Sequence, residues 1–422
     1  MREATAALGA GRSTTAYQVL LVALLCLNFG ILFFDRNALN FLMPYVQPEL
    51  HLSYTQVGLL GSGLSFTWAL AAAFVGWLSD TIARRKIIIV VSGVVFSVCS
   101  VASGFASSFL MLFGARLLMG LSEGGVMPIS HAMVAAEVSP KWRALAMGVT
   151  QNVGSSLLGS TVAPLVLVPV ALAWGWRHAF FLAAAPGLMS ALLIVLFVVE
   201  RPIPKAPPRM AGERLPLLAT LTERNVMACA VMSVVLVSYL VITWAFMPLV
   251  LVQYRHIDDK TAAALMAVLG VSSFLASFAV TAASDFIGRK PVMVAMPLIG
   301  VALPLAALYF DGSAFVLGAI FFVGWLFNGI FPMFMATVPT ESVSRAQVAT
   351  AMGIVMGLGE ILGGVFGPSI AGSLSDAYGL GAPCWMLVAL ALGGTLAALF
   401  LRETAPRLVG ERAEPGLSET FA

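Results

Sequence analysis

Residues 76–86 read GWLSDTIARRK, and residues 281–290 read TAASDFIGRK. Each stretch is a short polar loop between two long apolar runs, and in each an acidic residue precedes two adjacent basic residues. At an offset of 205 positions the charged residues align in three pairs: Asp80 with Asp285, Arg84 with Arg289, and Arg85 with Lys290. A charged loop that occurs twice at this spacing predicts a chain built from two similar halves.

Further residues repeat at nearly the same offset. The tripeptide Ala-Met-Gly occurs at 146–148 and again at 351–353. Four residues match at an offset of 204: Gly120 with Gly324, Pro128 with Pro332, Glu137 with Glu341, and Pro164 with Pro368. Because one nearly constant offset holds over many predicted segments, we infer that the two halves share one origin.

The composition indicates a membrane protein. Of the 422 residues, 60% are hydrophobic and 10% are charged, whereas about 25% of the residues in a soluble domain are charged. The mean hydropathy is +0.96. This composition excludes disordered, collagen-like and coiled-coil proteins. The net charge of +3 is too small and too scattered for a nucleic-acid-binding protein.

Apolar runs of about 20 residues, the length that crosses a bilayer, predict twelve transmembrane helices. We expect an all-α membrane protein with two pseudo-symmetric six-helix bundles, at 17–199 and 226–402. Residues 1–16 and 403–422 are predicted tails, and 200–225 is a Pro- and Arg-rich linker with one short interfacial helix. The predicted helices span 17–47, 54–80, 86–106, 109–137, 143–168, 176–199, 226–254, 262–284, 291–310, 313–340, 347–375 and 382–401.

The basic residues predict the orientation in the membrane. Most of the 23 Lys and Arg residues fall in the two tails, the linker and the loops on one side of the predicted bundle. The other side carries Arg177, Arg255 and Lys260. Because basic loops stay in the cytoplasm, we expect a multi-pass protein of the bacterial inner membrane with both termini cytoplasmic.

Five polar residues lie inside predicted helices of the first half: Asp35, Arg36, Arg116, Glu123 and His131. Such side chains cost about 2.5–3.5 kcal/mol each at the bilayer centre and therefore face cavities. Arg116 and Glu123, seven residues apart, point to one face about 10 Å apart along the axis. Their repeat partners are apolar: Leu240, Val241, Ile320, Phe327 and Met335. The charged chemistry is therefore predicted for the first half, and permanent ion pairs that join helices are the alternative.

The two charged loops resemble the signature of the major facilitator superfamily, G-x-L-x-D-x-x-G-R-K/R, with departures at Ala83 and Thr281. This resemblance covers the chain from about residue 17 to residue 401. It implies a transporter whose halves rock around a midplane site. It also implies that the two charged loops form a latch that gates the transporter. The alternative is that their basic residues only anchor the loops on the cytoplasmic side. The gating candidates are Asp80, Arg84, Arg85, Asp285, Arg289 and Lys290.

Four segments narrow the resemblance: FFDRNALNFLMP (33–44), RLLMGLSEGGVMPISH (116–131), QNVGSSLLGSTVAP (151–164) and GWRHAFF (175–181). They look like the anion:cation symporter family of organic-acid and sugar-acid proton symporters. On that resemblance Asp35 and Glu123 carry protons, Arg36 recognises substrate, and Arg116 pairs with Glu123. Residues 186–202 and the Asp35–Arg36 pair also look like bacterial spinster-type lipid transporters.

The expected function is proton-coupled symport of a small organic anion, a sugar acid or another carboxylate, by alternating access. A spinster-like exporter of lysolipids or drugs is the alternative. An enzyme is not expected, because the sequence has no nucleophile with a base, no HExxH and no carboxylate metal cluster. We expect no cofactor, no metal and no nucleic-acid partner. The partners are the anion, protons and the bilayer, and the protein is expected to be a monomer.

Further residues are candidates for contact with the substrate. Each of these polar side chains either lines the cavity and contacts the substrate, or holds neighbouring helices together. The substrate-binding candidates are Arg36, Arg116, His131, Gln151, Asn152, Tyr239, Trp244, Asn328 and Glu360.

Overall fold

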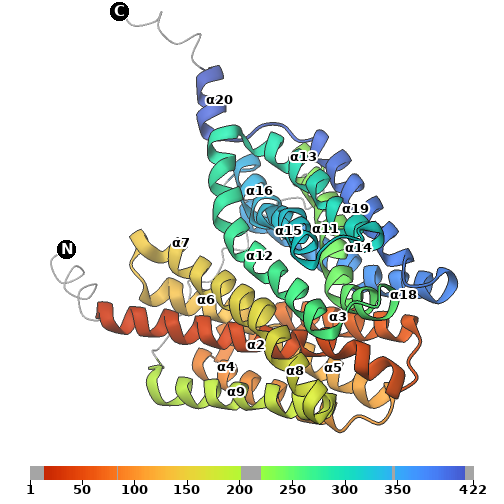
Figure 1. Cartoon of the computed structure of the whole chain (residues 1–422). Coiled ribbons are helices and arrows are strands. Elements are labelled where there is room, and N and C mark those ends of the chain that lie inside the picture. Colours follow the sequence, from red (N-terminus) through yellow and green to blue (C-terminus); the bar gives the residue numbers. More distant parts are fainter. Residues whose placement is uncertain (1–13, 83, 201–219, 345–346, 414–422) are drawn as a thin grey trace, which may run out of the picture.

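The computed structural model describes residues 14–82, 84–200, 220–344 and 347–413, and these residues form helices and short connections without a strand (Figure 1). The helices of the first half, from red to yellow-green, lie together, and those of the second half, from green to blue, form a second group. Eleven helices of the described residues are long and apolar enough to cross a membrane. With α3 (Tyr54–Ile82) they make the expected twelve.

The first half follows the predicted order, with several helices longer or more segmented than expected. Its predicted first helix, for example, begins at Thr15 and runs to Glu49 instead of 17–47. The elements are α2 (Thr15–Glu49), α3, α4 (Arg85–Gly104), α5 (Phe109–Glu123), α6 (Val126–Glu137), α7 (Pro140–Gly148), η1 (Val149–Val153), η2 (Ser155–Val162), α8 (Ala163–Trp174) and α9 (Trp176–Phe197).

The second half begins two residues earlier than predicted, and the expected linker helix falls mainly in 201–219, outside the described residues. Its elements are α11 (Arg224–Leu249), η3 (Val250–Tyr254), α12 (Asp259–Ile287), α13 (Arg289–Gly300), α14 (Ala302–Tyr309), α15 (Ala314–Trp325), η4 (Leu326–Ile330), η5 (Met333–Thr337), α16 (Val338–Ser342), α17 (Val348–Leu358), η6 (Gly359–Val365), α18 (Phe366–Tyr378), α19 (Ala382–Leu399) and α20 (Pro406–Ala413).

Backbone features recur between the halves at the offset of the sequence repeat. His51 and His256, 205 positions apart, have φ values of 50° and 52° in the turns that follow α2 and η3. Both are left-handed conformations that non-glycine residues adopt rarely. The π-helical segments η2 and η6 also begin 204 positions apart, at Ser155 and Gly359. The duplication therefore preserves unusual backbone geometry as well as sequence.

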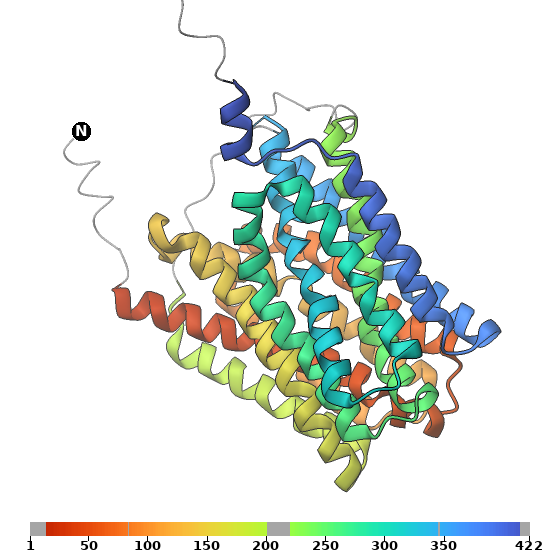
Figure 2. The same ribbon diagram turned by 45° about the horizontal axis from the view of Figure 1, so that its top comes forward.

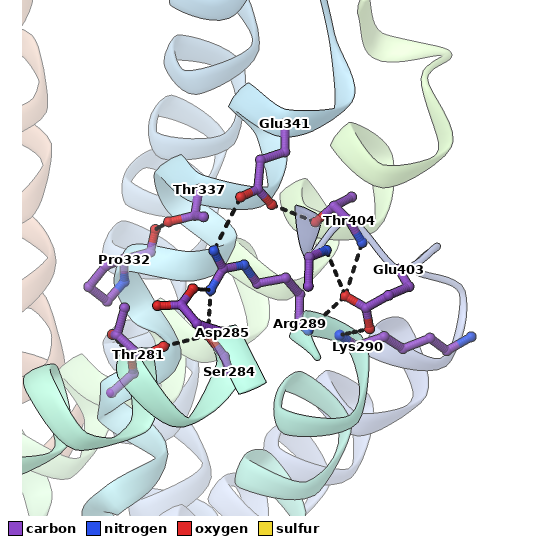
Figure 3. Close-up of polar contacts among 12 residues, drawn as sticks. Thr281, Ser284, Asp285, Arg289, Lys290, Pro332, Thr337, Glu341, Glu403 and Thr404 are labelled. Atoms are coloured by element: carbon purple, nitrogen blue, oxygen red, sulfur yellow. Dashed lines mark hydrogen bonds and ion pairs between the residues drawn. The ribbon is translucent and has the colours of Figure 1, made fainter. Parts of the chain in front are cut away.

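The helix that follows each charged loop is capped at its N-terminus by a glutamate from the end of the same half. In the second half, Glu403 accepts hydrogen bonds from the backbone N–H groups of Arg289 (2.8 Å) and Lys290 (3.1 Å), at the start of α13 (Figure 3). In the first half, Glu200 accepts a bond from the N–H of Lys86 (3.3 Å), at the start of α4. A carboxylate at a helix N-terminus binds free N–H groups and complements the helix dipole.

The loops that carry these basic residues define one face of the molecule, which we call the basic face. At this face α7 of the first half and α20 beyond the second half stand apart in both ribbon views (Figures 1 and 2). The other face, which we call the opposite face, carries the turns at His51 and His256. The two halves come into contact at the opposite face.

A carboxylate of the second half caps a helix of the first half at the opposite face. Asp376, near the end of α18, accepts bonds from the N–H groups of Tyr54 and Thr55 at the start of α3, both at 2.8 Å, and from the Thr55 hydroxyl at 2.6 Å. Close backbone packing accompanies these bonds, because a Cβ at Gly58 or Gly372 would overlap a carbonyl oxygen of the other half. Contact between the halves at the opposite face therefore provides hydrogen-bond acceptors for the free N–H groups at the start of α3.

Replacing Asp376 by Asn is expected to weaken this closure, because one amide oxygen cannot accept the three bonds of a carboxylate and has no charge to complement the helix dipole. Each 1.4 kcal/mol lost changes the ratio of closed to open molecules about tenfold. Distances between spin labels at Ser107 and Lys260, both exposed at this face, should show a larger open population in Asp376→Asn.

The matched control for this measurement is Ser373→Ala on the same helix. The Ser373 hydroxyl lies 3.4 Å from the Thr55 hydroxyl and donates to the carbonyl of Ser369 in its own helix. We expect wild-type distances for Ser373→Ala. Identical distance distributions in Asp376→Asn and the wild-type protein would contradict the capping role.

Replacing Glu403 by Gln is expected to lower the free energy of unfolding by about 1 kcal/mol, the usual value of a capping side chain. Burial alone would raise the pKa of Glu403, but four backbone N–H donors lower that pKa below its usual range. A carboxylate with a lowered folded-state pKa stabilises the protein at neutral pH and loses this effect as the pH falls through that pKa. Tryptophan-fluorescence melting should show the largest difference at neutral pH, narrowing below about pH 4.

Glu223→Gln is the control, because Glu223 is the N-cap residue of α11 and its side chain makes no capping hydrogen bond. Its melting temperature should remain near that of the wild-type protein. A pH-independent difference between Glu403→Gln and the wild-type protein would show that the carboxylate charge is not what stabilises α13.

Candidate functional site

A small cavity lies between the two halves, with a volume of about 50 Å³. Two guanidinium groups, Arg36 and Arg116, line it together with the polar side chains of Asn40 and Ser65. The remaining wall is apolar and comes from both halves: Leu39, Met43, Val57, Leu60, Gly61, Leu64, Val241 and Ala245. Two cations and a few polar groups in an apolar enclosure are typical of a binding site for a small anion.

Close packing between α3 and α5 holds the charged face of α5 toward this cavity. A Cβ at Gly120 would overlap the hydroxyl of Thr67 and the carbonyl of Leu64, and one at Gly124 would overlap the carbonyl of Trp68. Small residues of this kind allow helix backbones to approach closely in membranes. The helix then breaks after Glu123, at the two glycines before α6.

Asp35 lies in the middle of α2 and is fully buried. Its Oδ1 accepts a short hydrogen bond from the hydroxyl of Ser100 on α4, and its Oδ2 has no hydrogen-bond partner among the described residues. A buried carboxylate with one donor is only partly compensated. This position is therefore suited to a change of protonation state.

Arg116 is 2% exposed and donates through Nη1 to the backbone carbonyl of Arg36 at 3.0 Å. In the part of the chain that the structure describes, its Nε and Nη2 have no hydrogen-bond partner. An arginine fork normally binds two acceptors. Two donors of this cavity-lining guanidinium are therefore unpaired in this conformation.

Glu123 is 1% exposed, and neither carboxylate oxygen has a hydrogen-bond partner within the described ranges. Its ion pair is with Arg36, at 4.0 Å, and not with Arg116 as the resemblance implies. The Arg36 guanidinium also lies over the rings of Phe33 and Trp68, 5.6 and 5.7 Å from their centroids. Glu123 forms its ion pair with Arg36 rather than with Arg116, because the Arg116 guanidinium points toward the backbone carbonyl of Arg36 on α2.

Glu360 is brought to the centre from the second half. It lies in η6, and its Oε2 is near Gly364, which also approaches Ser65 of α3. Its charge interacts with that of Arg36. The candidate from the second half is therefore near Arg36, although it does not line the cavity itself.

The remaining substrate candidates lie away from the cavity wall. Tyr239 is fully buried, donates to the Gly300 carbonyl at 2.8 Å and packs on Phe327. Trp244 packs edge-on against Phe41 and Trp325. The Nε2 of His131 is buried without a partner. Four further candidates do not line this cavity and their contact with substrate stays a prediction: His131, Gln151, Asn152 and Asn328.

The gating candidates of the second half form a network at the basic face (Figure 3). Arg289 pairs with Asp285 at 2.6 Å and with Glu341 at 3.2 Å, and Glu341 accepts from the Thr404 hydroxyl at 2.6 Å. The backbone of Lys290 binds Glu403, as described above. All of these groups belong to one half, so the network holds that half together in this conformation.

The gating candidates of the first half are arranged differently. Arg84 is exposed, and Arg85 donates to the carbonyl of Ala132 on α6 at 3.0 Å. The side chain of Asp80 lies outside the described residues. A gating role for these six residues stays a prediction.

Several residues at these sites were not candidates from the sequence. Asn40 and Ser65 line the cavity, Ser100 binds Asp35, and Glu403 caps α13. The spacing of Asn40 four residues after Arg36, one helical turn, is a signal for the first of these. Serines are common in membrane helices, so Ser65 and Ser100 carry no such signal. Among the described residues, no group of three or more His, Cys, Asp or Glu side chains is placed to hold a metal.

Known proteins resemble this chain over parts of their lengths. It is 31% identical to the hexuronate transporter of Bacillus subtilis over 252 residues, 58% of each chain. It is 30% identical to a probable sulfoacetate transporter of Cupriavidus necator over 183 residues, 43% of this chain and 42% of that protein. The chain thus aligns with about half the length of these relatives.

The fold matches a solved structure over nearly its whole length. A bacterial homologue of the human lysosomal transporter Spinster, in an inward-facing unoccupied conformation, superposes with a TM-score of 0.69 at 20% identity. The match covers 92% of this chain and 95% of that chain. At this identity the likeness shows the fold alone.

The family profile described as Major Facilitator Superfamily matches residues 25–245 and 227–421, one match for each half. The duplicated signature loops and the twelve helices agree with this match. These relatives are transporters, so the prediction that the protein is not an enzyme is confirmed. The chain belongs to the Major Facilitator Superfamily.

Proposed function

We propose that the protein carries a small organic anion, a sugar acid or another carboxylate, together with protons across the bacterial inner membrane. The observation that carries this proposal is the cavity between the halves, lined by Arg36 and Arg116. A guanidinium keeps its charge at any physiological pH and binds carboxylates through two parallel hydrogen bonds. The arginines therefore favour an anion over a cation as the transported compound.

The buried charges explain why the anion would travel with a proton. When Glu360 is protonated and both Asp35 and Glu123 are ionised, Arg36 and Arg116 balance the two carboxylates. A bound monoanion would add one negative charge in a region where uncompensated charge is expensive. Protonation of one carboxylate restores the balance and releases an arginine for the anion. Anion binding and proton binding thus favour each other.

The arrangement of the halves supports alternating access. Both halves contribute to the cavity wall, and the Asp376 cap closes the molecule at the opposite face. Rocking of one half against the other would break this cap and expose the cavity at that face. Because one chain supplies both walls, we propose that the monomer transports. The excess of basic residues supports a cytoplasmic location of the basic face and of both termini.

The relatives support the substrate class. Hexuronate is a sugar acid and sulfoacetate is a small organic acid, and each is named as the compound carried by one of the relatives. The cavity combines two cations with the Asn40 and Ser65 side chains, which can bind hydroxyl or carboxylate oxygens. This combination fits a polar organic anion better than an acyl chain.

The experiment that tests the proposal measures the external pH of lightly buffered, de-energised vesicles after addition of sugar acids, short dicarboxylates or aromatic carboxylates. We expect alkalinisation for at least one acid, because the anion enters with a proton. The double variant Asp35→Asn, Glu123→Gln should give none. A pH that stays constant over the whole panel would contradict organic-anion symport and favour export of lipids or drugs, which release of a lysolipid from loaded vesicles would detect.

The single variant Glu123→Gln separates proton coupling from substrate binding. It should reduce proton-driven accumulation at least about tenfold, a loss of 1.4 kcal/mol in driving force, because the amide cannot exchange a proton. Exchange of labelled for unlabelled substrate needs no net proton movement and should persist. Loss of exchange in Glu123→Gln would show that this residue is required for binding or movement rather than for carrying the proton.

Replacing Arg116 by Lys is expected to weaken anion binding by about tenfold or more, because an ammonium group cannot keep the bond to the Arg36 carbonyl and also bind a carboxylate bidentately. The dissociation constant of the active acid, measured by calorimetry on purified protein, checks this. Arg255→Lys is the control, because Arg255 also donates to a backbone carbonyl, that of Ala307 at 2.9 Å, away from the cavity. Equal dissociation constants for Arg116→Lys and Arg255→Lys would show that Arg116 is not part of the anion-binding site.

A further inference from the structure

Ser100 differs from Ser97 and Ser103, the nearest buried serines on α4. Ser97 and Ser103 donate to the carbonyls of Gly93 and Cys99, four residues earlier in the same helix, both at 2.8 Å. This is the usual arrangement of serine inside a membrane helix. The Ser100 hydroxyl instead reaches two other helices: it contacts Oδ1 of Asp35 on α2 and lies 3.3 Å from the carbonyl oxygen of Phe180 on α9.

These two acceptors suit the two protonation states of Asp35. When Asp35 is ionised, the Ser100 hydroxyl donates to Oδ1. When a proton binds at Oδ1, that carboxyl O–H donates to Ser100 Oγ, and the Ser100 hydrogen turns to the Phe180 carbonyl. A hydroxyl can donate one bond and accept two, and a backbone carbonyl has two lone pairs, so both arrangements are allowed. One proton is gained and no other covalent bond changes.

Of the residues that the structure describes, Ser100 alone is hydrogen-bonded to the Asp35 side chain. Oδ2 has no hydrogen-bond partner, and the residue is fully buried. The charged and titratable groups that face Asp35 are Arg116 and Glu123 from α5 and the thiol of Cys99 from α4. They act on the charge of Asp35 through space, whereas Ser100 is bonded to it.

We propose that Ser100 is the positioning residue for the proton on Asp35: its hydroxyl, held between Asp35 and the Phe180 carbonyl, gives that carboxyl a hydrogen bond in both protonation states. This inference rests on the proposed role of Asp35 as a proton carrier. A carboxyl whose Oδ1 is bonded in both states can load and release its proton without losing the hydrogen bond at that oxygen. Ser100 thus lowers the barrier between the two states rather than binding the transported anion.

The experiment that tests the proposal is a pH titration of the whole protein in liposomes followed by infrared difference spectroscopy. The carboxyl band that is lost in Asp35→Asn reports protonation of Asp35. In Ser100→Ala the ionised carboxylate has lost its donor, so the midpoint of this band should move to higher pH by about one unit, the size of a hydrogen-bond effect on an acid. The band frequency should also change, because the protonated carboxyl has lost its acceptor.

Two further variants separate positioning from packing. Ser100→Thr keeps the hydroxyl and should restore both the midpoint and the frequency. Ser103→Ala removes a buried hydroxyl from the same helix and should leave both at their wild-type values. A midpoint and frequency in Ser100→Ala equal to those of the wild-type protein would overturn the proposal, and so would the absence of any titrating band that depends on Asp35.

Transport measurements on the same liposomes keep this inference distinct from the proposed function. The pH profile of proton-driven uptake should shift with the infrared midpoint in Ser100→Ala, whereas exchange of labelled for unlabelled substrate should not. An infrared shift in a protein that moves no protons with any acid would leave Ser100 as the partner of Asp35 and contradict symport. Symport with an unchanged infrared midpoint would contradict the role of Ser100 alone.

Discussion

Charge inside an apolar helix bundle has to be compensated, and the arrangement of the first half follows from this constraint. Two carboxylates and two arginines on α2 and α5 lie close enough to balance each other. Gly120 on α5 and Gly124 directly after it bring α5 against α3, which turns the charged face of α5 toward the centre. The compensation is incomplete, because Glu123 has one ion pair at 4.0 Å and no hydrogen bond. Incomplete compensation leaves room for a proton or an anion.

The two halves share their backbone features because of the duplication, but the charged site is not duplicated. The turns at His51 and His256, the π-helical segments and the capping glutamates Glu200 and Glu403 occur in both halves at nearly the same offset. The central charges of α2 and α5 do not recur. The second half contributes the apolar wall at Val241 and Ala245. The charged site therefore lies mainly in the first half, and the second half adds Glu360 to a mostly apolar wall.

The same capping chemistry serves two purposes in this fold. Glu403 caps α13 within its own half, so this contact remains when the halves move. Asp376 caps α3 of the other half, so its bonds exist only while the opposite face is closed. A helix N-terminus with unsatisfied N–H groups thus becomes part of the energy difference between conformations. Both caps are carboxylates that bind backbone N–H groups. Their effects differ because the Glu403 cap joins two segments of one half, whereas the Asp376 cap joins the two halves.

The sequence alone determined the twelve helices, the duplication and the buried charges Asp35, Arg36, Arg116 and Glu123, because apolar length, constant offsets and charge in apolar runs are properties of the chain itself. Only the tertiary structure decided that Arg36, not Arg116, pairs with Glu123, that Tyr239 packs away from the cavity, and that Ser100 and Asp376 reach other helices. The rotation of each helix about its axis sets these contacts. That rotation depends on packing between segments far apart in the sequence, which no local pattern records.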